Sequence, residues 1–205
     1  MTRLYLTRHG ETQWNLEGRV QGSRDSQLTK KGIVQATQLS KYLEDVHIDI
    51  IYSSSSDRAY NTAKIVGENR QIPIIKLDGL KEMNLGIWEG KTFDLIRKDY
   101  KEMHETFWNK PHLLCEFPGE SFDEFRERVV NSVLDIINNN KGKNILIVAH
   151  ALVLKFVMSY FENRPLDKLF HEPFMHSTCL NEVEITDSEY KIVKYAQTNH
   201  YDIEV

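Results

Sequence analysis

Histidine, arginine and glutamate side chains follow four short apolar segments of this chain. Arg8 and His9 come after the first segment, Arg58 after the second, Glu82 after the third and His150 after the fourth. Guanidinium groups are planar forks of donors that suit phosphate oxygens. A neutral imidazole can attack phosphorus as a nucleophile, and a carboxylic acid can protonate a leaving oxygen. These residue types together predict phosphoryl-transfer chemistry.

Each of these residues, taken alone, also has an ordinary structural explanation. An arginine after a strand is more often a surface charge, and a single histidine is more often simply hydrogen-bonded. The prediction therefore depends on parallel strands, because their carboxyl ends meet at one edge of a sheet, where ligands bind. Gly10 would let the backbone approach a ligand closely. A helix beginning after His150 would offer free N–H groups to an anion.

The hydrophobic pattern predicts alternating strands and helices. Strands are expected at residues 2–7, 48–52, 72–77 and 145–149. Helices are expected from residue 29, over 57–68, from the capping box at 121–124, and over 152–161. A hairpin is expected over 180–196, and Pro73 favours an edge position for its strand. This order predicts an α/β fold of three layers, α/β/α, with a mostly parallel central sheet.

The region between the third strand and the capping box is irregular and rich in aromatic residues. We expect short helices there, forming a cap insertion at about residues 83–118 of a single domain spanning 1–205. Apolar side chains of the cap could line the entrance to a phosphate site: Phe93, Met103, Phe107, Trp108 and Leu114. Such a wall suits aryl or alkyl leaving groups better than a carboxylate. The alternative is that these side chains only pack the cap.

Composition excludes several classes of protein. The chain has 205 residues, a formal net charge of −4 and 40% hydrophobic residues, which favours a globular fold over disorder. Its negative charge makes nucleic acid and anionic membranes poor partners. A small phosphate-bearing molecule remains the expected partner, because Arg8 and Arg58 can make one pocket locally positive. Cys115 and Cys179 lack the spacing of a zinc site or disulfide framework. With no signal-like apolar run, we expect a cytoplasmic protein, either monomer or homodimer.

Several ordered segments resemble the motifs of the histidine phosphatase superfamily, which includes the cofactor-dependent phosphoglycerate mutases. The matching segments are residues 6–12, Asn15 with 18–22, 53–63, 82–90, 118–121 and 148–150. An Arg-His-Gly tripeptide alone would be a weak signal, whereas this ordered set covers nearly the whole chain. The resemblance implies a phosphoglycerate mutase-like fold and an enzyme that needs neither a metal nor another cofactor.

The resemblance also implies roles for individual residues. His9 would become phosphohistidine, Glu82 would be the general acid and base, and Arg8, Arg58 and His150 would hold the phosphoryl group. Substrate-binding positions would be Asn15, Gln21, Gly22 and Ala151. Ala151 stands where relatives usually have glycine. Because alanine favours helices, we expect an ordinary helix start there and no backbone strain.

Within the family, the sequence favours a phosphatase. Mutases are generally longer and usually carry a Tyr-Gly sequence after the catalytic glutamate, whereas this chain has Leu85-Gly86-Ile87-Trp88. That form, and residues 107–113, are similar to broad-specificity phosphatases. A phosphoglycerate mutase and an α-ribazole phosphatase remain alternatives. Two other classes are less favoured: a vestigial phosphoprotein-binding module, and a metal-dependent hydrolase, in which the two arginines would repel a dication.

Overall fold

The sheet is built outward from β4 (Asn144–Ala149), whose successive residues enter two different hydrophobic clusters, one on each face. In the computed structural model, which describes residues 1–186 and 189–201, β1 (Thr2–Arg8) and β2 (Ile50–Ser54) pair with β4 in parallel. β3 (Ile74–Leu77) pairs in parallel with β2. The carboxyl ends of all four strands therefore meet at one edge, which confirms the arrangement on which the predicted site depends.

The remaining two strands make the sheet mixed. β5 (Leu180–Ile185) is antiparallel to β1, and β6 (Tyr190–Gln197) is antiparallel to β5. The strand order is β3-β2-β4-β1-β5-β6, so β3 lies at the edge, as Pro73 indicated. The predicted hairpin is confirmed, although residues 187 and 188 of its turn lie outside the described residues.

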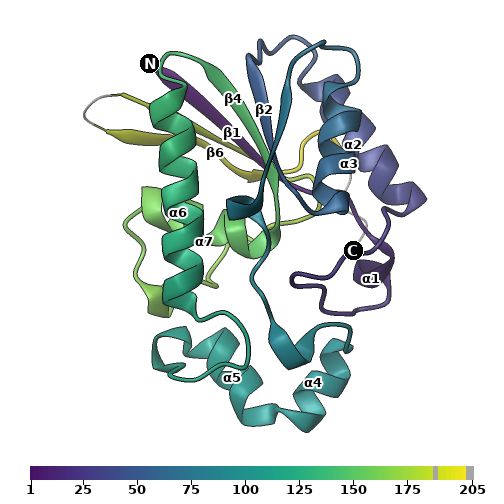
Figure 1. Ribbon diagram of the computed structural model, residues 1–205, viewed down its shortest axis with the longest axis vertical. Helices are drawn as coiled ribbons and strands as arrows, with labels where there is room; N and C mark the ends of the chain where they lie inside the picture. Colours follow the sequence, from purple (N-terminus) through teal and green to yellow (C-terminus); the bar gives the residue numbers. More distant parts are fainter. Residues whose placement is uncertain (187–188, 202–205) are drawn as a thin grey trace.

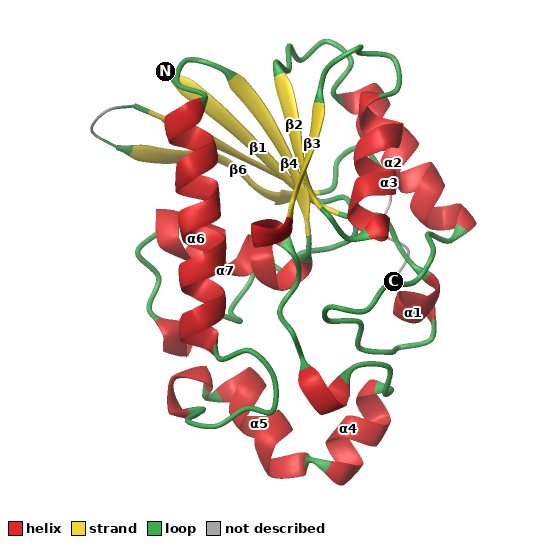
Figure 2. Cartoon of the chain, in the orientation of Figure 1, coloured by secondary structure: helices red, strands yellow, loops and turns green. Residues whose placement is uncertain are grey.

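Helices cover both faces of the sheet (Figure 2). α2 (Lys30–Tyr42) and α3 (Asp57–Gly67) pack on one face, where they bury Leu39 and Ala63. α6 (Phe122–Asn139) and α7 (Ala151–Phe161) pack on the other. The three-layer α/β/α prediction is confirmed. The capping box at Ser121 is also present, because Glu124 Oε2 accepts a hydrogen bond from the Ser121 backbone N–H at 3.0 Å.

Short helices lie beyond the carboxyl edge of the sheet, at the foot of Figure 1. They are η2 (Gly86–Trp88), α4 (Phe93–Asp99), α5 (Lys101–Asn109) and η3 (Pro111–Leu113). Other short helices are α1 (Gln13–Leu16), η1 (Asp78–Leu80) and η4 (Leu166–Lys168). The division into one domain with a cap at 83–118 stays a prediction. In the described ranges, no helix has the length and apolar character that spanning a bilayer requires.

The apolar spacing that predicts α2 places Ile33 on its buried face, and this expectation is wrong. Ile33 is 46% exposed, while Gly32 is buried. At Gly32 the helix meets the first loop closely: a Cβ on Gly10 would lie 2.4 Å from the Gly32 carbonyl oxygen. Gly10 therefore permits close approach of the first loop to α2, and its close approach to a ligand stays a prediction.

Candidate active site

The carboxyl edge of the sheet opens into a cavity of about 340 Å³ beneath the cap helices. Arg8, His9, Arg58 and Glu82 all line it. His150 is fully buried beside them, with its ring centroid 5.3 Å from that of His9. The structure therefore brings together all five residues predicted to be catalytic, from the ends of four strands.

The hydrogen bonds of His9 define its tautomer. Its Nδ1 lies 2.7 Å from the carbonyl oxygen of Gly10, and because a carbonyl can only accept, Nδ1 carries the proton. Nε2 is then unprotonated, and it accepts a hydrogen bond from Nε of Arg58 at 3.2 Å. Burial, followed by the charges of Arg58 and Arg8, holds the pKa of His9 well below its usual value. The ring is therefore a neutral base at neutral pH.

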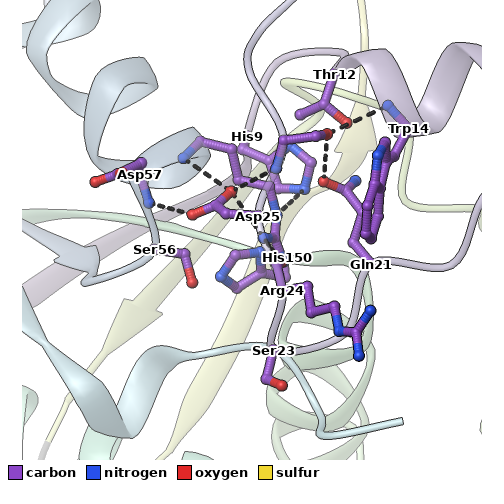
Figure 3. A network of polar contacts seen from close by, with 12 residues as sticks. His9, Thr12, Trp14, Gln21, Ser23, Arg24, Asp25, Ser56, Asp57 and His150 are labelled. Atoms are coloured by element: carbon purple, nitrogen blue, oxygen red, sulfur yellow. Dashed lines mark hydrogen bonds and ion pairs between the residues drawn. The ribbon is translucent and has the colours of Figure 1, made fainter. Parts of the chain in front are cut away.

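Arg58 is anchored by the loop that follows α1. Its Nη1 donates to Asp25 at 3.0 Å and to the Arg24 carbonyl at 2.6 Å, and its Nη2 donates to the Gly22 carbonyl at 2.8 Å. Asp25 also accepts from the backbone N–H of Asp57, at the start of α3 (Figure 3). α3 lacks a side-chain cap of its own from Ser56. Asp25 therefore caps this helix from a distant loop and holds Arg58 against His9.

Two buried donors at this site have no hydrogen-bond partner. Nε of Arg8 and Nδ1 of His150 are both unpaired, whereas Nη1 of Arg8 donates to the Met175 carbonyl at 2.9 Å. Buried polar groups are normally paired. Both nitrogens are therefore free to bind an anion at this edge of the sheet.

Ser54 indicates which nitrogen of His150 carries the proton. Its Oγ accepts from the backbone N–H of Ser56 at 3.3 Å and lies 2.8 Å from Nε2 of His150. The hydroxyl of Ser54 can donate its proton to Nε2, and in that arrangement the imidazole proton is on Nδ1. Burial and the positive charge of Arg58 lower the pKa of His150 well below its usual value. In this tautomer a neutral His150 presents an N–H at Nδ1.

Glu82 lies at the N-terminus of α7. Its Oε2 accepts from the backbone N–H of Leu152 at 3.2 Å, and its Oε1 accepts from the backbone N–H of Met83 at 3.1 Å. The free N–H groups at the start of this helix were expected to bind a substrate anion, but the N–H of Leu152 donates to Glu82. Burial raises the pKa of Glu82, and this effect exceeds the opposing hydrogen bond from Leu152 and the charge of Arg58. A raised pKa favours the protonated acid.

The residues predicted to bind substrate also line the cavity: Asn15, Gln21, Gly22 and Ala151. Gln21 accepts a hydrogen bond from Ser26 at 2.9 Å (Figure 3). Gly22 has a φ of +55°, a backbone conformation that favours glycine. Ala151 is the first residue of α7, following a cap residue in extended conformation, so the predicted ordinary helix start is confirmed.

Sequence reasoning missed several residues of the site and of the cavity wall. They are Asp25, Ser54, Glu89, His104 and Lys155. Glu89 accepts from the backbone N–H groups of Ser23 and Leu85, so it joins the loop that follows α1 to the loop that follows Glu82. The partners of these residues are distant in sequence, and no local pattern marks them. His104 lies in a helix rich in polar residues, whereas Lys155 is a lone lysine in the otherwise apolar run 151–158, a signal that could have marked it.

Comparison with known proteins identifies the family. The model of the histidine phosphatase superfamily (branch 1) matches residues 4–198, and the chain belongs to that family. The solved structure of YhfR from Bacillus stearothermophilus is 42% identical and superposes with a TM-score of 0.94, covering 98% of this chain and 99% of that one.

Curated relatives include both phosphatases and mutases. The adenosylcobalamin/alpha-ribazole phosphatase of Escherichia coli K12 is 34% identical over 170 residues, which is 82% of this chain and 83% of that protein. A probable phosphoglycerate mutase, GpmB of Escherichia fergusonii, is 33% identical over 159 residues, which is 78% of this chain and 74% of that protein. The family resemblance seen in the sequence is confirmed.

The lowered pKa of His150 predicts an acid-dependent loss of stability. The folded state keeps this imidazole neutral, whereas the unfolded chain takes up a proton below its ordinary pKa of about 6.5. The free energy of unfolding contributed by this residue should fall by roughly 1 kcal/mol between pH 7.5 and 5.5. Denaturant titrations of wild type and His150→Asn measure this fall in stability. Glu82, whose raised pKa changes the stability with pH in the opposite direction, is present in both proteins, so the difference between them reports on His150.

The variant should lose less stability than wild type over this range. His112→Asn, which removes an exposed histidine, should behave as wild type does. Equal pH dependence in wild type and His150→Asn would show that His150 is not held neutral.

Proposed function

We propose that this histidine phosphatase hydrolyses small phosphomonoesters in two steps, with His9 as the nucleophile. The observation that carries the proposal is the tautomer of His9: its Nδ1 donates to the Gly10 carbonyl, so Nε2 holds the reactive lone pair. Arg8 and His150 supply unpaired N–H groups beside it for the phosphoryl oxygens. Transfer of a phosphoryl group depends mainly on such positioning and positive charge.

In the first step, Nε2 of His9 forms a bond to phosphorus while the bond from phosphorus to the leaving oxygen breaks. Glu82 gives its proton to that oxygen, so the product leaves as an alcohol. Arg58 already lies 3.2 Å from Nε2 through its Nε–H, and it carries positive charge next to the transferred group. The raised pKa of Glu82 supports the acid role because it keeps the proton on the carboxyl group.

In the second step, water attacks phosphorus as the bond to Nε2 of His9 breaks. Glu82, now ionised, accepts the proton of the attacking water and returns to its starting form. The low pKa of His9 supports this step, since a neutral imidazole is regained when inorganic phosphate is released. Both steps balance without a metal or another cofactor.

The cavity wall supports aryl or alkyl esters as substrates. Phe93, Phe107 and Trp108 line the cavity, as the sequence predicted, together with Trp88 and Phe170. Met103 and Leu114 instead pack against the hydrophobic core. Lining of the cavity supports a role in substrate binding for Phe93, Phe107 and Trp108, and packing supports the structural alternative for Met103 and Leu114. An aromatic wall binds an apolar leaving group by burying its surface.

Trapping the intermediate tests the role of His9. Brief exposure to a ³²P-labelled phosphomonoester in excess chelator should give a labelled protein that is stable to alkali and labile to acid. His9→Ala should abolish the label, while His112→Ala, an exposed histidine, should retain it. A label that persists in His9→Ala would assign the nucleophile elsewhere. Turnover that chelator removes and zinc restores would favour a metal-dependent hydrolase using His9, His150 and Glu82.

Leaving-group dependence tests the role of Glu82. Glu82→Gln should lower kcat/KM for an alkyl phosphate by about 10²- to 10⁴-fold, because a poor leaving group needs the proton. The loss for 4-nitrophenyl phosphate, whose leaving group needs no proton, should be much smaller. Glu116→Gln, at an exposed position, is the control. Equal losses for both esters would contradict the acid role.

A panel of phosphomonoesters tests the class of substrate. We expect phenyl phosphate to be hydrolysed with higher kcat/KM than 3-phosphoglycerate, because the cavity wall is aromatic. The panel should include phosphoserine and α-ribazole phosphate, and should be run with and without bisphosphoglycerate. Mutase turnover above phosphatase turnover would overturn the proposed function. A clear preference for phosphoglycerate would show that the aromatic wall serves only packing.

A further inference from the structure

A buried lysine interrupts the apolar wall of the active-site cavity. Lys155 lines the cavity and is only 7% exposed. Its Nζ donates to the carbonyl oxygen of His171 at 2.5 Å. An ammonium has three donors, and buried lysines are rare unless they are paired. Within the described residues, the ammonium bonds to this neutral acceptor and forms no direct ion pair.

The charges of Glu172 and Glu162 act on Lys155 without forming an ion pair with it, and Glu162 is itself paired with an arginine. Oε2 of Glu162 lies 2.8 Å from Nε of Arg164, and Arg164 also donates to the His171 carbonyl. Across residues 1–186 and 189–201, no carboxylate oxygen is found within ion-pair distance of the Lys155 ammonium. Burial, followed by the charge of Arg164, lowers the pKa of Lys155 to about 8. An anion entering the cavity would relieve this destabilisation of the charged form.

The position of Lys155 along α7 relates it to the reacting atoms. Ala151, Leu152 and Lys155 all line the cavity, and their spacing places them on one face of the helix. Glu82, the proposed acid, accepts from the backbone N–H of Leu152. Lys155 is four residues beyond Ala151, or about 6 Å along the helix axis. A leaving group protonated by Glu82 would therefore extend along the first turn of α7, toward Lys155.

The same cavity contains a buried donor without a partner. This donor is the indole Nε1 of Trp88, and Trp88 lines the cavity. The rings between Trp88 and the Lys155 region are in contact, because the ring centroid of Phe107 lies 5.2 Å from that of Trp88 and 5.7 Å from that of Phe170. The wall thus combines aromatic surface with the unpaired indole N–H and the ammonium of Lys155.

We propose that Lys155 forms a second subsite, which binds a carboxylate carried on an aromatic leaving group. The aromatic side chains bury the ring, and the ammonium pairs with the carboxylate at its far end. A phosphate and a carboxylate placed para on one ring are separated by about the distance from Ala151 to Lys155 along α7. This subsite rests on the proposed phosphatase function. The expectation that the cap wall offers little to a carboxylate stays a prediction, since the charge of this subsite comes from α7 and not from the cap.

The test compares three aryl phosphates that differ only in whether, and where, the ring carries a carboxylate. Wild type should hydrolyse 4-carboxyphenyl phosphate with a kcat/KM at least tenfold above that for 3-carboxyphenyl phosphate. Phenyl phosphate, which has no carboxylate, is the reference for both. Lys155→Met should lower kcat/KM for 4-carboxyphenyl phosphate at least tenfold and change that for phenyl phosphate less than threefold. Lys155→Arg should retain part of the preference.

Controls separate the subsite from folding and from the reaction itself. Lys155→Gln removes the charge but keeps a donor for the His171 carbonyl, so it covers a folding failure of Lys155→Met and should show the same selective loss. Lys168→Met, at an exposed position, should leave both esters unaffected. Equal losses for both esters, or no loss for either, would overturn the subsite.

Failure of the proposed function would give a different result. If wild type hydrolyses neither ester, the phosphatase proposal fails, and 4-carboxyphenyl phosphate becomes a stable ligand. Calorimetric titration of wild type and Lys155→Gln with that ligand then tests the subsite directly. Weaker binding in the variant would support the subsite, and equal binding would overturn it.

Discussion

Two hydrogen bonds of opposite sense hold the buried imidazole of His9, and the chemistry of the site depends on them. The Gly10 carbonyl accepts from Nδ1, and Nε of Arg58 donates to Nε2, so the lone pair and the positive charge lie together. A protonated imidazole could not accept from Arg58, and burial beside two guanidinium groups keeps the ring neutral. Other parts of the fold position Arg58 and keep water away from this contact.

Long-range contacts supply that positioning. Asp25 binds both the side chain of Arg58 and the start of α3, so one carboxylate fixes the rotamer of the arginine and satisfies the helix that carries it. Glu89 joins the loop containing Asp25 to the loop that follows Glu82. Arg58 and the loop that follows Glu82 are thereby held by one connected network, in which each carboxylate compensates backbone N–H groups as well as charge.

The cavity above this site combines surfaces from different parts of the chain. The cap contributes Trp88 and Phe107, and the segment after α7 contributes Phe170. Lys155 adds a buried cation from α7 itself. In the proposed reaction, the residues at the edge of the sheet act on the phosphate ester bond, whereas these side chains contact the leaving group. Family membership alone therefore does not identify the substrate, since relatives that share the edge include both phosphatases and a probable mutase.

The sequence by itself determined the layered α/β/α fold, the capping box at Ser121 and the five residues at the strand ends, because strand and helix periodicity and caps are local properties of the chain. Only the tertiary structure decided that Gly10 packs against Gly32, that Asp25 holds Arg58 and that Lys155 faces the cavity. Each of these depends on which distant backbone or side chain comes within a few ångströms, and no spacing along the chain encodes that distance.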